Sequence, residues 1–261
     1  MKLEQRALRF QSGGAGLIGI VDVPERPLVR GMLVVPDSTQ YRAGSHRQFT
    51  LLSRLLAARG VAVMRFDRRG AGDSEGDAEG GGNSGLAEEM GAEDIAAAMK
   101  EFFIHVPEMK ESVILAPGDA APLAARYAAG DPRVSGLALL EPVLPPELAP
   151  ARGVRQDGPR SAAERLFRRA SAFRRAAARA GLGKGPVPTA RPAPAATIGA
   201  FSGRLLLVTA GVVPAEAAAC PAGPQTPRSR RIEIAGGGPD ERGSAWRDAV
   251  AFACASWLTS W

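Results

Sequence analysis

The chain has 261 residues, of which 45% are apolar, and a formal net charge of +6. This length fits one large α/β domain or two small ones, and the composition is that of a globular protein. No apolar run reaches the ~18 residues of a membrane span, and the segment MKLEQRALRF has no signal-peptide core. Two cysteines are too few for a disulfide framework or a metal cluster. We therefore expect a cytoplasmic protein without a cofactor.

The positive charge is concentrated in one stretch. Residues 152–184 contain ten Lys or Arg and two carboxylates, a net charge of +8 that leaves −2 for the rest of the chain. The basic character therefore belongs to one insertion.

Predicted strands and helices alternate along the chain. Ser45 resembles an N-cap, with Gln48 three residues later, and Gly60 ends the helix that follows. This alternation predicts the α/β class, with a mostly parallel sheet of about eight strands, helices on both faces, and ligands at the carboxyl ends of the strands. Strands are expected near 7–11, 17–23, 31–36, 61–66, 113–115, 134–140, 205–208 and 232–234, and helices at 46–59, 86–104, 120–127 and 245–258.

The stretch 112–125, SVILAPGDAAPLAA, is typical of a buried strand that turns sharply into a helix. In an α/β-hydrolase this strand–turn–helix is the nucleophile elbow, with small residues on either side of a strained Ser, Cys or Asp. Here Ala116 and Ala120 are the small residues, and the central position is Gly118, which has no side chain.

Four segments indicate a family. QYRAGSHRQF (40–49) and VMRFDRRGAGDSEG (63–76) resemble the exosortase A system-associated hydrolase 1 family, α/β-hydrolases encoded beside exosortase and exopolysaccharide genes in Gram-negative bacteria. Residues 118–142 and 243–258 are similar to the family's elbow region and closing helix. The resemblance implies an α/β-hydrolase core at 1–145 and 203–261, with a cap or lid insertion at 146–202.

The resemblance also implies a Cys or Ser nucleophile, an acid and a late His. The nucleophile position holds Gly118, and the oxyanion loop carries Asp37, whose charge would repel a developing oxyanion. No carboxylate occurs at 209–214, where the acid is expected, and no His occurs at 236–241, where the base is expected.

Few other residues could replace them. Of the two histidines, His105 ends a helix ahead of the elbow strand, and His46 is better suited to a structural or pocket-lining role than to that of a general base. Without a base, Ser38 and Ser74 are weak nucleophiles. Asp119 is a further weak candidate, as in dehalogenase-like hydrolases, although the residue type and position also suit a helix N-cap.

The turn 67–76 resembles a catalytic motif because it holds Asp67, Arg69 and Asp73. We predict instead a structural turn, in which charges pair across the loop and glycines adopt positive φ.

The insertion contains an amphipathic, arginine-rich stretch at 160–180, followed by a Pro/Ala/Gly-rich linker. It is either a cap helix with a solvated basic face or a weak contact, through Arg160–Arg179, with an anionic membrane or acidic polysaccharide. No nucleic-acid partner is expected.

Two functional hypotheses follow. The first is a degenerate family member, a pseudoenzyme that binds a small acyl or glycan-related ligand or acts as a scaffold. The alternative is an active esterase or thioesterase whose catalytic site has moved.

Overall fold

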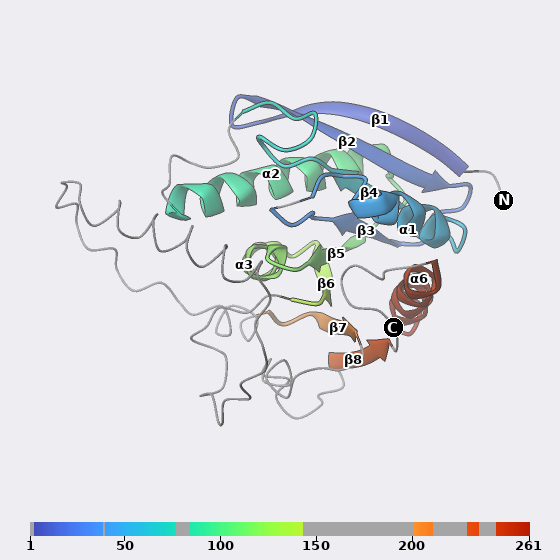
Figure 1. Cartoon of the computed structure of the whole chain (residues 1–261). Helices are drawn as coiled ribbons and strands as arrows, with labels where there is room; N and C mark the ends of the chain where they lie inside the picture. Colours follow the sequence, from blue (N-terminus) through green and yellow to red (C-terminus); the bar gives the residue numbers. More distant parts are fainter. Residues whose placement is uncertain (1–2, 39, 77–83, 143–200, 211–228, 235–243) are drawn as a thin grey trace, which may run out of the picture. The chain divides into compact units, whose positions relative to one another are not determined.

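The computed structural model describes residues 3–38, 40–76, 84–142, 201–210, 229–234 and 244–261. Within these residues eight strands form one sheet, in the order β1-β2-β4-β3-β5-β6-β7-β8 (Figure 1). The strands are β1 (Leu3–Ser12), β2 (Ala15–Pro24), β3 (Arg30–Val34), β4 (Val63–Phe66), β5 (Glu111–Pro117), β6 (Val134–Leu140), β7 (Arg204–Ala210) and β8 (Ser229–Ile234).

The sheet is mostly parallel, as predicted. The strands β1 and β2 form an antiparallel hairpin, and β2 pairs antiparallel with β4. From β4 to β8 every neighbouring pair is parallel. The loops that follow β3, β5 and β6 therefore leave the sheet at the same edge.

Helices cover both faces of the sheet (Figure 1). On one face lie α2 (Ser84–His105) and α3 (Ala120–Gly130), and on the other lie α1 (Gln48–Ala57) and α6 (Ser244–Leu258). Strand β5 shows why its sequence is continuously apolar: Ile114 packs with the α2/α3 side and Leu115 with the α1/α6 side, and both are fully buried.

The predicted start of α1 is wrong. Ser45 does not cap this helix but begins a 3₁₀ turn, in which His46 and Arg47 have φ values of +48° and +59°. The N–H of Ser45 donates instead to the side-chain oxygen of Gln40 (3.0 Å). Because of this bond and the left-handed residues after it, the α-helix begins only at Gln48.

A buried ion pair ties the antiparallel part of the sheet to α1. Asp22 on β2 is 0% exposed, and the Arg65 guanidinium on β4 lies 3.3 Å from its Oδ2 atom. Gln5 donates to the other carboxylate oxygen (2.7 Å), and Arg65 also donates to the Ser53 hydroxyl on α1 (3.1 Å). Burial lowers the pKa of Arg65, although the charge of Asp22 acts in the opposite direction.

Removing one partner leaves a buried charge without compensation. We expect Asp22→Ala to lower the free energy of unfolding by about 3–5 kcal/mol. Arg9→Ala is the matched control, because it breaks the exposed Arg9–Glu75 pair and should cost no more than about 1 kcal/mol. Urea unfolding followed by circular dichroism measures both, and equal losses would contradict the prediction.

A second charged group lies where α3 passes into β6. The Asp131 carboxylate accepts hydrogen bonds from the guanidinium of Arg133 (2.7 Å) and the hydroxyl of Tyr127 (2.5 Å). Burial would raise the pKa of Asp131, but these bonds outweigh it and hold the pKa at about 2. Burial, with the hydrogen bond to Asp131, raises the pKa of Tyr127.

Because the pKa of Asp131 is lower in the folded than in the unfolded state, its contribution is complete above the unfolded value of about 3.9 and is lost as pH falls toward 2. We expect the stability difference between the wild type and Asp131→Asn to be constant above about pH 5 and to shrink between about pH 4 and pH 2. Urea unfolding over this pH series measures it. A difference that stays constant throughout would contradict the assignment.

The predicted cap, 146–202, lies almost wholly outside the described residues, so its boundaries and its basic helix stay predictions. Of the helices that the structure describes, none combines the length and the apolar character needed to cross a membrane.

Candidate functional site

The sharp turn predicted from the sequence is present. Strand β5 ends at Pro117, α3 begins at Ala120, and Gly118 between them has a φ of +52°, in the left-handed region that favours glycine. The N–H of Gly118 donates to the carbonyl of Leu140 at the end of β6 (2.9 Å), which holds the turn against the sheet. This is the backbone geometry of a nucleophile elbow.

Asp37 lies beside this turn. A Cβ atom added at Gly118 would be 3.4 Å from Asp37 Oδ2, an ordinary van der Waals distance, so the neighbours leave room for a Cβ there. The Nε2 atom of Gln40 donates to the same carboxylate oxygen (2.7 Å). The Oε1 atom of Gln40 in turn accepts from Nε2 of Gln48 (2.7 Å), which fixes the loop to the start of α1.

The two weak nucleophile candidates Ser38 and Asp119 are brought together. Asp119 accepts the N–H of Ser38 at Oδ1 (2.9 Å) and the Ser38 hydroxyl at Oδ2. Both residues are exposed. The Ser38 hydroxyl is thus paired with a carboxylate, and carboxylates are in general weaker bases than the imidazole that activates a serine nucleophile.

The prediction that Asp119 caps α3 is confirmed in position only. Asp119 does occupy the N-cap position, but its side chain makes no hydrogen bond to the helix. Its backbone is already helical (φ −77°, ψ −7°), whereas a capping residue is extended, so the carboxylate points to the loop after β3 instead.

Both histidines lie among the described residues. His46 is exposed in the 3₁₀ turn before α1, on the segment that follows β3. His105 is the last residue of α2, as predicted, and lies 3.8 Å from Glu101 within the same helix. Its carbonyl accepts from Arg6 on β1 (2.6 Å). Six residues later Glu111 begins β5, so His105 lies near the end of the sheet opposite the elbow.

The buried carboxylate of Asp67 organises the turn that follows β4. Asp67 is 0% exposed and accepts hydrogen bonds from the N–H of Arg42 (2.6 Å), the Arg42 guanidinium and the N–H of Asp73 (3.0 Å). Gly72 has a φ of +57°, and a Cβ atom there would lie 2.3 Å from Asp67 Oδ2. Only glycine leaves room for the carboxylate.

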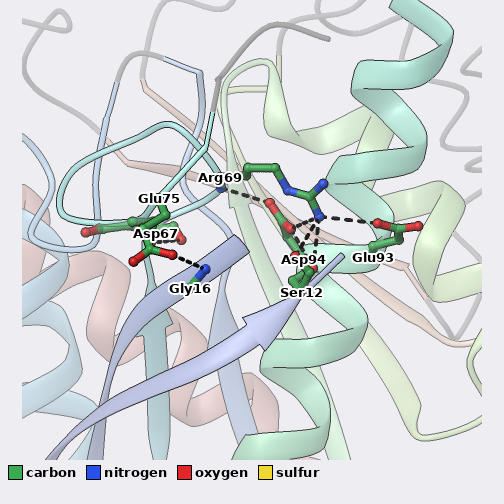
Figure 2. A network of polar contacts seen from close by, with 8 residues as sticks. Ser12, Gly16, Asp67, Arg69, Glu75, Glu93 and Asp94 are labelled. Carbon is green, nitrogen blue, oxygen red and sulfur yellow. Dashed lines mark hydrogen bonds and ion pairs between the residues drawn. The ribbon is translucent and has the colours of Figure 1, made fainter. Parts of the chain in front are cut away.

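Figure 2 shows how the same turn is held to β1, β2 and α2. The buried Asp94 of α2 accepts the N–H of Arg69 (2.8 Å), its guanidinium (3.0 Å) and the hydroxyl of Ser12 (2.7 Å). Glu75 accepts the N–H of Gly16 (2.9 Å). The prediction of a structural turn whose glycines have positive φ is confirmed, but its charges pair with other elements, Arg42 and α2, rather than with one another.

The remaining predicted catalytic positions are only partly described. Thr209 and Ala210 end β7, but 211–214, the rest of the loop expected to hold the acid, lies outside the described residues. So does 236–241, where the base is expected. The expectation that these loops lack an acid and a histidine therefore stays a prediction from sequence.

Sequence reasoning missed two contacts, the Asp37–Gln40 bond and the Ser38–Asp119 pair. A signal for the second was present. Ser38 and Asp119 follow strands that were both expected to end at the ligand-binding edge, and β3 and β5 are neighbours in the sheet. Carboxyl ends of adjacent parallel strands lie about 5 Å apart, so their loops meet.

Comparison with known proteins identifies the fold. The chain resembles a solved structure of an esterase from Pyrococcus furiosus, with 15% identity over 98% of this chain and 92% of that one and a TM-score of 0.67. It resembles an alpha/beta hydrolase from Sphaerobacter thermophilus, with 20% identity over 97% of this chain and 100% of that one and a TM-score of 0.61. It also resembles the proline iminopeptidase of Mycobacterium smegmatis, with 14% identity over 98% of this chain and 100% of that one and a TM-score of 0.65. No protein-family model matches the sequence, and neither does any curated protein.

Together with the eight-stranded, mostly parallel sheet, these likenesses show that the chain has the α/β-hydrolase fold. At such low identities they show the fold alone.

A side chain at Gly72 would lower stability in two ways that can be measured separately: backbone strain from the positive φ, and a clash with the Asp67 carboxylate. Gly14 also has a positive φ (+87°), but nothing lies within 4 Å of an added Cβ, so Gly14→Ala measures the backbone cost only. We expect about 1–2 kcal/mol for Gly14→Ala and at least about 1–3 kcal/mol more for Gly72→Ala, which displaces a buried hydrogen-bonded carboxylate. Thermal and urea unfolding measure the difference. Equal losses of stability in the two variants would mean that displacing the Asp67 carboxylate costs nothing, which would contradict the prediction.

Proposed function

We propose that this protein is a degenerate α/β-hydrolase, a pseudoenzyme that keeps the frame of the active site and binds a ligand or a partner without hydrolysing it. The observation that carries the proposal is Gly118. It occupies the centre of a well-formed elbow, has no nucleophile, and faces the carboxylate of Asp37.

The chemistry of acyl transfer supports this reading. Hydrolysis by this fold needs a nucleophile, a base that removes its proton, and hydrogen-bond donors for the oxyanion. At the elbow the first is absent, and the loop that should supply donors presents Asp37, an acceptor. Among the described residues, the Ser38 hydroxyl donates a hydrogen bond to Asp119, and carboxylates are in general weaker bases than the histidine that this chemistry uses.

We further propose that the lineage is the exosortase A system-associated hydrolase 1 family and that the protein acts in the cytoplasm. The support for this lineage is the segment 40–49, which resembles this family more specifically than it resembles α/β-hydrolases in general. Its Gln40 binds Asp37 beside the elbow, and its Arg42 binds the buried Asp67. These residues hold the loops around the elbow in place, and this structural role does not require a nucleophile.

The ligand would be a small acyl or glycan-related molecule at the carboxyl ends of the strands. The arginine-rich insertion, Arg160–Arg179, would add a weak attraction to an anionic membrane or an acidic polysaccharide. Both parts of the proposal follow from the sequence and the resemblance.

The alternative is a hydrolase with a relocated nucleophile. One observation favours it: the hydroxyl of Ser38 already has a carboxylate partner in Asp119 at the correct edge of the sheet. The test must therefore distinguish a nucleophile at Ser38 or Asp119 from an elbow that has no nucleophile at Gly118.

The first measurement is labelling by serine- and cysteine-directed activity probes, read by peptide mass spectrometry, together with a chromogenic short-chain ester assay. We expect no fold-dependent labelling and no turnover by the wild type. Gly118→Ser should fold, since its Cβ has room, lose about 1–2 kcal/mol of stability from its positive φ, and still not turn over the ester, because no base accompanies it.

Gly118→Cys checks that the elbow itself is accessible. Its thiol should react with an electrophilic probe in the native fold, slowly, because the neighbouring carboxylate raises the pKa of a thiol. Heat-denatured protein is the control for labelling. Native labelling of the wild type at Ser38 or Asp119, with turnover abolished by Ser38→Ala or Asp119→Asn, would contradict the pseudoenzyme proposal and establish the alternative.

A further inference from the structure

A cavity of about 660 Å³ lies at the end of the sheet opposite the elbow. Its walls are the end of α3 with the loop that follows, the first residues of β6 and β7, and Trp261. This volume is within the ~300–1,000 Å³ range of small-molecule sites. Among the residues that line it are Gly130, Asp131, Pro132, Phe201, Arg204 and Trp261.

Arg204 gives the cavity a positive charge. Its guanidinium lies 4.9 Å from the centre of the Trp261 ring, and within the described parts of the chain it forms no ion pair with a carboxylate. The acid in the wall, Asp131, is already bound by Arg133 (2.7 Å) and Tyr127 (2.5 Å). The lining thus presents one cation that is not compensated.

The aromatic part of the wall is packed against its neighbours. The ring of Trp261 contacts the guanidinium of Arg30 (4.0 Å from its centre) and that of Arg204 (4.9 Å), and its centre lies 5.6 Å from that of Trp257 in an edge-on arrangement. Arg30 also donates to the main-chain oxygen of Trp261. Phe201, which packs partly against the core, supplies a second apolar surface.

We propose that this cavity binds a small aromatic carboxylate. The ring would contact Trp261 and Phe201, and the carboxylate would pair with Arg204, whose planar fork matches a carboxylate in a bidentate manner. The site is separate from the elbow, because β6 runs the seven residues from Val134 beside the cavity to Leu140 beside Gly118, about 20 Å at roughly 3.3 Å per residue. The proposal for this cavity therefore does not depend on whether the elbow is catalytic.

The test is isothermal titration of the full chain with 2-naphthoate, and with 2-naphthamide as the uncharged probe of the same shape. We expect one naphthoate per chain. Arg204→Gln should weaken its binding about tenfold, the usual size of one charge-assisted pairing. The amide should bind the wild type as weakly as naphthoate binds Arg204→Gln. Arg204→Lys keeps the charge without the fork and should lie between the two.

Arg126→Gln is the matched control, since this arginine of α3 pairs with Glu88 (2.6 Å) and does not line the cavity. It should change the affinity by no more than about twofold. Circular dichroism and thermal unfolding confirm that each variant is folded. The proposal is overturned if the wild type shows no saturable naphthoate binding, if Arg204→Gln binds as tightly as the wild type, or if Arg126→Gln loses as much affinity as Arg204→Gln.

Discussion

The buried carboxylate of Asp67 is the constraint on which the elbow edge of the molecule depends. A charge removed from water must be neutralised and hydrogen-bonded, and here the loop after β3 supplies Arg42 while the turn after β4 supplies the N–H of Asp73. Two loops that are far apart in sequence are thereby joined at one group. The loop after β3 then passes, through Gln40, to Asp37 beside Gly118.

Much of the fold could be predicted from the sequence because the sheet is buried on both faces. A strand covered on both sides must be apolar throughout, so short apolar runs mark it; β6 was predicted with the bounds that it has, 134–140. The hairpin β1–β2 was predicted too short. Its outer strand is largely exposed, and most of its residues carry no apolar signal.

The start of α1 and the role of Asp119 were mispredicted for one reason. Local rules of helix capping assign Ser45 and Asp119 to the helix that each precedes, but each residue bonds a group outside that helix. The N–H of Ser45 donates to the side chain of Gln40, five residues earlier in the same loop. The carboxylate of Asp119 accepts from Ser38 on the loop after β3, a contact that depends on β3 and β5 being neighbours, which local sequence does not reveal.

Glycine at position 118 also affects how the protein tolerates change. A serine or cysteine nucleophile at a φ of +52° would store about 1–2 kcal/mol of backbone strain, which the surrounding structure must overcome. Glycine stores almost none, yet the bond from its N–H to Leu140 that holds the turn is still made. At this one position the chain is therefore free of the backbone strain that a serine or cysteine would carry. That difference is enough to offset one destabilising surface substitution of ordinary size elsewhere in the chain.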